Sequence, residues 1–203
     1  MKAGFAKACV TPPVGMQMSG LGQQGGATGV HDDLFARALY LREGEAEFII
    51  LAFDLLFFER GEIDRFKGAI GRRCDLPASH VLLNCSHCHS GPRLTRWHYS
   101  VEPERWYIEE VEGAMLDAVG RARHAAEEVS LHAVTARTDL PVQRRRPGPG
   151  GEVEWAPYPD GDICDALPVC LMRRPDGSIV SFLFSVSCHP SMIYGRDISA
   201  GYP

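Results

Sequence analysis

The chain has 203 residues, which is long enough for one domain with a hydrophobic core. Hydrophobic residues make up 45% of it and charged residues 23%, an ordinary composition for a globular protein. The formal net charge of -5 excludes the broad positive field that attracts nucleic acid or anionic lipid. The only basic run, residues 144–146, is too short to reverse that balance. The composition therefore argues against a nucleic-acid-binding protein.

Targeting and membrane signals are not found in the sequence. The N-terminal residues lack the apolar core of a signal peptide and reach Pro12 and Pro13 early. The longest apolar run, residues 48–58, contains Asp54 and is too short to span a bilayer. Seven cysteines are an odd number with no paired framework, which favours reduced thiols. We therefore expect a cytoplasmic protein without a transmembrane segment.

The first half of the chain alternates between predicted strands and helices. Residues 34–41 and 46–54 are apolar runs separated by a short connection that contains Gly44, which predicts two paired strands. Residues 58–72 carry apolar side chains at helical spacing. Residues 80–84 predict a short buried strand. This order of elements is typical of an α/β protein.

The second half contains the best helix and a second hairpin. Residues 103–126 begin near a proline and repeat apolar side chains at helical spacing, which predicts a long helix. Residues 129–136 predict a strand, and residues 141–162 are rich in Pro and Gly and predict mostly loop. Residues 167–174 and 178–187, joined by Pro-Asp-Gly, predict a β-hairpin. We therefore expect the α/β class, with mixed β-sheets flanked by helices.

Two histidine-bearing loops each follow a predicted strand. His87 and His89 lie directly after residues 80–84, and side chains two apart on an extended chain point to the same side. His189 follows the strand at 178–187. If the two strands are neighbours, the loops meet at one edge of a sheet. Imidazole suits zinc, copper or iron, and zinc is the usual hydrolytic choice, although His-x-His pairs also occur on ordinary strands.

Two cysteines offer an alternative to a histidine metal site. Cys85 and Cys88 form a C-x-x-C pair, which is typical of redox motifs and of half of a structural zinc site. Other cysteines could supply a second half, but no second C-x-x-C follows at a diagnostic spacing. His31 is expected in an N-terminal loop. Four further histidines stand alone and are expected at the surface or capped in the core: His80, His98, His124 and His132.

An ordered series of motifs resembles the neutral, non-lysosomal ceramidases and their bacterial relatives. The most specific piece is His87-Cys88-His89-Ser90-Gly91-Pro92, which resembles the family's His-Thr-His-Ser-Gly-Pro signature. The other pieces, in chain order, are Thr11-Pro12-Pro13, Met18-Ser19-Gly20, Gly29-Val30-His31, the Leu-Phe-Ala-Arg-Ala of residues 34–38, Gln143-Arg144-Arg145, Cys188-His189-Pro190 and Ile198-Ser199-Ala200. Residues 1–203 as a whole resemble the N-terminal portion of a neutral-ceramidase-like catalytic domain, as one truncated domain.

This resemblance implies a zinc-dependent amide hydrolase that cleaves an N-acyl bond in a small-molecule substrate, including a lipid such as a sphingolipid. By position, His87 and His189 match two zinc ligands. His89 matches a polar residue that faces the reacting group, and Arg144 matches the arginine that contacts the substrate or oxyanion. Arg145 is a possible substitute for Arg144 within the same run.

Two departures from the family lead to an alternative function. The glutamate and tyrosine that complete the family's zinc site stand beyond the 203 residues, and Gly201 stands where the family has aspartate. We expect the chain by itself to retain metal poorly, because two imidazoles are only half of a four-ligand site. The alternatives are a catalytically silent binding module of the same fold, and a structural-zinc or thiol protein that uses Cys85 and Cys88.

Overall fold

The computed structural model describes residues 1–20, 25–96, 103–193 and 195–201. In chain order, its elements are β1 (Lys2–Cys9), β2 (Gly29–Val30), β3 (Phe35–Glu43), β4 (Ala46–Phe53), α1 (Arg60–Cys74), the short 3-10 helix η1 (Ala78–His80), β5 (Val81–Cys85), α2 (Arg105–His124), β6 (Glu127–Glu128), β7 (Ser130–Arg137), β8 (Arg145–Pro147), β9 (Val153–Trp155), β10 (Ala166–Arg173), β11 (Ile179–Phe184) and β12 (Asp197–Ile198).

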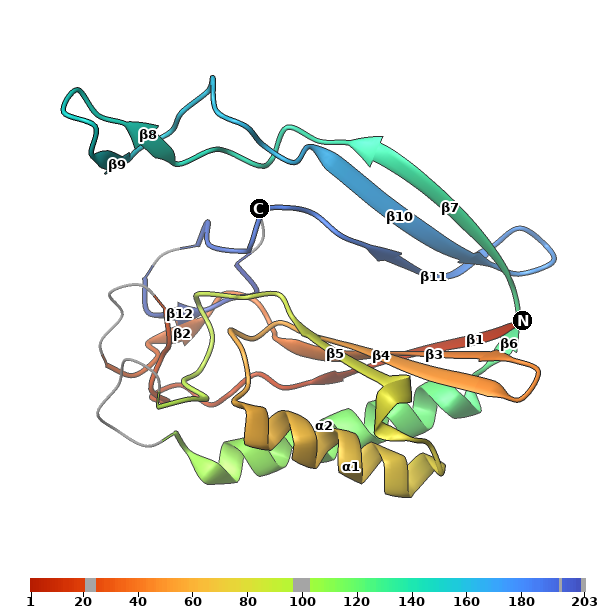
Figure 1. The fold of residues 1–203 in the computed structure, drawn as a ribbon. Coiled ribbons are helices and arrows are strands. Elements are labelled where there is room, and N and C mark those ends of the chain that lie inside the picture. The colour runs from red at the N-terminus through yellow and green to blue at the C-terminus, as the bar shows by residue number, and fades with distance from the viewer. Residues whose placement is uncertain (21–24, 97–102, 194, 202–203) are drawn as a thin grey trace.

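Two sheets and two helices form the layers of the molecule. The five-stranded sheet has the order β5-β4-β3-β1-β6, and its pairs are antiparallel except for β4 and β5, which are parallel. Helices α1 and α2 cover one face of this sheet, and the three-stranded sheet β11-β10-β7 lies on the other side (Figure 1). The predicted α/β class with mixed sheets is therefore confirmed.

The main core lies between the five-stranded sheet and the helices. Helix α2 buries residues three or four apart along one stripe, and this stripe packs against β1 and β3. Helix α1 adds Phe66 and Ile70, both fully buried. A smaller cluster, Ala3, Leu39, Val129 and Met172, joins the two sheets close to the N-terminus. This contact fixes the three-stranded sheet over the larger one.

Most predicted elements are confirmed to within a few residues. The two hairpins form as expected, and Gly44 adopts φ +58° in the turn between β3 and β4, where a residue without Cβ is favoured. Strand β1 was missed because its segment, Lys-Ala-Gly-Phe-Ala-Lys-Ala-Cys, is poor in β-branched residues. It lies in the sheet because β3 pairs with it along its full length.

One prediction at the strand level is wrong, and one short hairpin was missed. Residues 80–84 were expected to form a buried strand, but β5 lies at a sheet edge and leaves Leu82 57% exposed. Residues 141–162 are mostly loop, as expected, but the short hairpin β8–β9 within them was not predicted. The turn between those strands closes through a hydrogen bond from Gly148 N–H to the Glu152 carbonyl, at 2.8 Å, which local Pro and Gly content did not indicate.

No helix among the described residues combines the length and the apolar character needed to cross a bilayer.

We predict that Tyr107→Phe destabilises the fold by about 1–3 kcal/mol, because it removes a buried hydrogen bond. The Tyr107 hydroxyl donates to the Val10 carbonyl, and the side chain is only 2% exposed. The phenylalanine leaves that carbonyl without its donor. Urea denaturation measures the free energy of unfolding, and Tyr158→Phe, at a half-buried loop position, is the matched control. Equal midpoints for Tyr107→Phe and the wild type would contradict the assignment.

Candidate metal centre

Three histidine rings from two distant segments lie together. The ring centroids of His87 and His189 are 5.3 Å apart. The His89 ring lies 4.9 Å from each of them. His189 lies 100 positions after His89 in the sequence, so only the tertiary structure brings the three rings together. We call these three side chains the histidine cluster.

Main-chain and hydroxyl hydrogen bonds join the two loops that carry the cluster. His89 N–H donates to the Pro190 carbonyl at 3.3 Å. The buried Ser90 hydroxyl donates to the Ile193 carbonyl at 2.7 Å, and the Ser90 carbonyl accepts from Ser199 N–H at 3.0 Å. Ser90 therefore contacts both sides of the later loop, which holds that loop against the His-x-His segment.

The two loops do not follow neighbouring strands of one sheet. Strand β5 is an edge of the five-stranded sheet, and β11 is an edge of the three-stranded sheet. The condition under which the loops would meet at one edge of a single sheet is therefore not met. They meet because the two sheets are stacked and their edge strands end at the same side, so the loops close across the gap between the sheets (Figure 1).

A parallel pairing of β2 with β12 adds two further motifs to this region. His31 N–H donates to the Ile198 carbonyl at 2.8 Å. The His31 ring hydrogen-bonds the Asp32 carboxylate at 2.8 Å, and the Ser199 hydroxyl donates to the same carboxylate. His31 is thus held by Asp32 in an N-terminal loop, as expected. This pairing anchors the segment that follows His189.

The His89 side chain is half-buried, and its two ring nitrogens have no hydrogen-bond partner within the described part of the chain. Both Nδ1 and Nε2 are enclosed, and neither has a hydrogen-bond partner among the described residues. Burial, followed by the charges of His87, His189 and Arg144, lowers the pKa of His89 to about 4. The ring is therefore neutral at pH 7. A buried imidazole with no partner is costly, and such a group indicates a missing ligand, ion or water.

His87 has the geometry of a residue held for function. Its backbone adopts φ +63°, a left-handed conformation that is unusual for a residue with a Cβ. The side chain is exposed, and its ring stacks near Phe57 with centroids 6.4 Å apart. Strained backbone of this kind is concentrated at ligand sites. His87 thus forms the open side of the cluster, where a ligand has access.

The spacing of the rings suits one zinc ion held by two imidazoles. With zinc–nitrogen bonds of about 2.0–2.1 Å and a tetrahedral angle, two bound imidazoles have centroids roughly 5 Å apart. The separation of His87 and His189 matches that value. As the side chains stand, no group of three or more His, Cys, Asp or Glu within the described ranges could hold a metal ion. The cluster therefore fits a two-histidine half-site better than a complete cage.

Arg144 is the arginine of its run that acts on the cluster. Its charge contributes to lowering the pKa values of both His89 and His189, while burial is the largest cause in each case. Arg146 is instead paired with Glu154 at 2.7 Å. The Arg144 guanidinium also stacks on the Trp155 ring. Sequence reasoning missed Trp155, because a lone tryptophan in a Pro- and Gly-rich segment carries no motif.

The C-x-x-C thiols are unlike a redox or zinc-thiolate pair. Burial raises the pKa of Cys85 to about 12 and that of Cys88 to about 11. The Cys88 thiol donates to the Ser199 carbonyl at 3.0 Å. Metal binding and thiol exchange both require the thiolate. The environment of these two side chains therefore favours a packing role.

The isolated histidines lie outside the cluster where they are described. The His80 ring hydrogen-bonds the Glu47 carbonyl and stacks on Phe48. His132 pairs with the Ser130 hydroxyl. His98 lies outside the described residues.

An apolar cleft of about 580 Å³ lies between the two sheets. Its walls come from β4 and β5 on one side and from β7, β10 and β11 on the other; they are mostly apolar and include Ile50, Leu82, Val134, Val169, Leu183 and Phe184. Asn84 and Ser185 also line it, and these residues precede His87 and His189 by only three and four positions. The cleft therefore approaches the histidine cluster along both edge strands.

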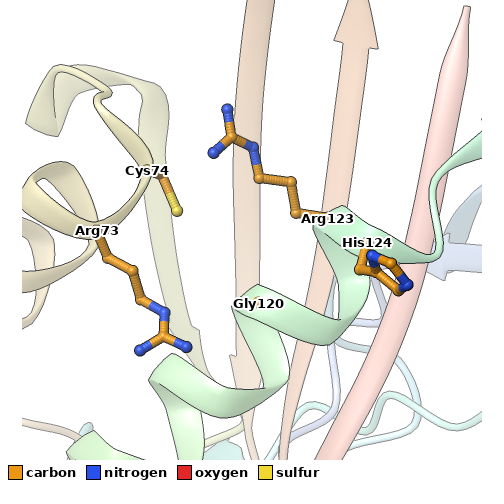
Figure 2. A pocket seen from close by; sticks show the side chains of 5 residues that line it. All are labelled: Arg73, Cys74, Gly120, Arg123 and His124. Carbon is orange, nitrogen blue, oxygen red and sulfur yellow. The ribbon is translucent and has the colours of Figure 1, made fainter.

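A second cavity, of about 320 Å³, lies between the C-terminal ends of α1 and α2 (Figure 2). Figure 2 shows Arg73 and Cys74 of α1 beside Gly120, Arg123 and His124 of α2. Arg123 forms an ion pair with Glu47 at 3.0 Å. Basic side chains at helix C-termini offset the partial negative charge of the free carbonyl groups. The basic side chains of this cavity are therefore explained by their position at helix C-termini.

Comparison with known proteins yields a match at the level of structure. No protein-family model matches this chain, and no curated protein sequence does. A crystal structure of neutral ceramidase from Pseudomonas aeruginosa is similar, with a TM-score of 0.79 and 18% identity, covering 98% of this chain and 34% of that one. A ceramidase complexed with C2 has the same TM-score and identity, with 33% of its chain covered.

The structural likeness therefore establishes a neutral-ceramidase-like fold. The chain spans about a third of the length of these neighbours. At 18% identity, membership of the family does not follow from the sequence match.

We predict that Asp32→Asn reduces stability near pH 7 and that this effect shrinks as the pH falls below about 4. The Ser199 hydroxyl, and then the His31 ring, hold the pKa of Asp32 below its ordinary value of 3.8. A carboxylate whose pKa is lowered by folding stabilises the protein above about pH 4, and this stabilisation is lost as pH falls through the folded-state pKa. Urea denaturation at several pH values measures the effect. A difference between variant and wild type that is constant from pH 7 to 2.5 would contradict it.

Proposed function

We propose that this chain carries the two-histidine part of a zinc-dependent amide hydrolase centre that cleaves the N-acyl bond of a lipid-like substrate. The observation that carries the proposal is the histidine cluster, in which His87 and His189 have the spacing of two ligands on one ion. The buried, unpartnered nitrogens of His89 beside them support it. The ceramidase-like fold is consistent with this chemistry.

His87 and His189 would hold the zinc ion. Bound zinc acts as a Lewis acid and lowers the pKa of its water towards about 7. The exposed side of His87 leaves the ion accessible, which hydrolytic centres require and closed structural sites lack. In the family that the sequence resembles, a glutamate and a tyrosine complete the ligand set.

His89 and Arg144 would stabilise negative charge on the carbonyl oxygen of the substrate. His89 is neutral at pH 7, so one of its nitrogens carries a hydrogen and donates a hydrogen bond without carrying charge. Arg144 brings a permanent positive charge to the same side of the cluster. Each such donor contributes about 3 kcal/mol to transition-state stabilisation.

The apolar cleft supports a substrate with a long hydrocarbon part. Its volume of about 580 Å³ is within the range of small-molecule sites, roughly 300–1,000 Å³. Asn84 and Ser185 line the cleft close to the histidine loops, so an acyl chain lying in it would bring its carbonyl group toward the cluster. This arrangement favours an N-acyl lipid over a short polar amide.

A catalytically silent binding module is the second candidate. The thiol alternative is weaker, because the raised pKa values of Cys85 and Cys88 keep both side chains protonated. Zinc binding and hydrolysis distinguish these functions.

We predict that the chain binds one zinc ion weakly and that His87→Ala or His189→Ala weakens this binding by about 100-fold, because complete four-ligand sites contribute about 10–16 kcal/mol. Cys85→Ser should bind zinc like the wild type. Competition with a chromophoric chelator measures the affinities. Loss of zinc binding in Cys85→Ser, but not in the histidine variants, would support a thiolate site. A folded wild type without zinc affinity would support the silent module.

We predict that Arg144→Lys lowers kcat for a fluorogenic N-acyl amide by about 100-fold in the zinc-loaded chain, because lysine does not reproduce the planar donors of arginine. Arg145→Lys, one position along, is the matched control and should stay within about twofold. The reverse order of effects would assign Arg145 to the site instead.

A further inference from the structure

The Arg144 guanidinium rests on the face of an aromatic ring. Its central carbon lies 4.7 Å from the centroid of the Trp155 ring, within the range of a cation–π contact. The register of the β8–β9 hairpin produces this contact, because Arg145 pairs with Trp155 and Arg144 is the next residue along. Ala156 N–H also donates to the Arg144 carbonyl at 3.2 Å.

The base of Arg144 is fixed by a second, independent contact. The side-chain oxygen of Gln143 accepts from the N–H groups of Arg144 and Arg145, at 3.0 and 3.2 Å. The Gln143 amide nitrogen donates to the Asp162 carbonyl at 3.2 Å. Gln143 thus holds the backbone at the start of the side chain, and Trp155 contacts its far end.

The guanidinium of Arg144 has no carboxylate ion-pair partner among the described residues. Glu154, on the opposite strand β9, forms an ion pair with Arg146. An arginine on a flexible stem loses considerable side-chain entropy when it adopts one orientation. An aromatic ring restricts the guanidinium without neutralising its charge, whereas a carboxylate partner would cancel that charge.

We infer that Trp155 is a positioning residue that holds the Arg144 guanidinium in one orientation, with its charge available to the substrate. The inference rests on the proposed function, since it assigns Trp155 a role through Arg144. Trp155 is 70% exposed, so its ring contributes little to the core. Its loss should therefore alter the orientation of Arg144 while leaving the fold intact.

Three variants of the full chain test the inference. Trp155→Leu keeps an apolar side chain without a π face, and Trp155→Phe keeps a smaller π face. Val153→Ala is the matched control, because Val153 lies on the same strand and is similarly exposed, at 68%. Circular dichroism and thermal melting establish that each variant is folded; if Trp155→Leu does not fold, Trp155→Phe carries the comparison.

The first measurement is the NMR resonance of the Arg144 side-chain Nε–H, identified by its loss in Arg144→Lys. A ring beneath the guanidinium shifts this resonance upfield. We expect the shift to be lost in Trp155→Leu, reduced in Trp155→Phe and unchanged in Val153→Ala. An Arg144 resonance that is the same in Trp155→Leu and in the wild type overturns the inference.

The second measurement is hydrolysis of the same N-acyl amide by the zinc-loaded chain. We expect kcat to fall roughly two- to fivefold in Trp155→Leu, with KM nearly unchanged and partial recovery in Trp155→Phe. An unchanged kcat with a lost ring shift also overturns the inference. A lost ring shift in a chain whose wild type does not hydrolyse amides contradicts the proposed function, while the contact of Trp155 with Arg144 stands.

Discussion

The candidate site depends on the hydrogen bonds that join two loops from different sheets. Ser90 makes two of these contacts, one through its hydroxyl to Ile193 and one through its carbonyl to Ser199. Because Ser90 is almost fully buried, both contacts are protected from water. Hydrogen bonds in the protein interior are electrostatically stronger than those in water. His89 and His189 are adjacent for this reason, since neither loop is otherwise paired to the other by strands of one sheet.

The same arrangement explains why the site combines polar and apolar character. The helices cover one face of the five-stranded sheet, while the small cluster around Met172 holds the other sheet over part of the opposite face. The remainder of that interface is an apolar cleft that ends beside the histidine loops. A hydrolytic centre for an N-acyl lipid needs both parts: a polar centre for the reacting bond and an apolar surface for the chain.

Much of the fold could be predicted from local patterns. The stripe of α2 and the turn at Gly44 each follow from short-range sequence rules, and both were found. Strand β1 could not be predicted in this way, because its weak propensity is overridden by pairing with β3. The hairpin β8–β9 was missed for a related reason: its pairing and the stacking of Arg144 on Trp155 are tertiary contacts within a segment of turn-forming residues.

The sequence by itself determined which side chains were candidates: the His-x-His motif, the later His-Pro and the arginine run, since residue types and their chain order are visible without a structure. Only the tertiary structure decided that His87, His89 and His189 are neighbours, and that Arg144 stacks on Trp155 whereas Arg146 pairs with Glu154. The physical reason is that ring separations of about 5 Å depend on long-range packing of two stacked sheets, which short-range periodicity does not encode.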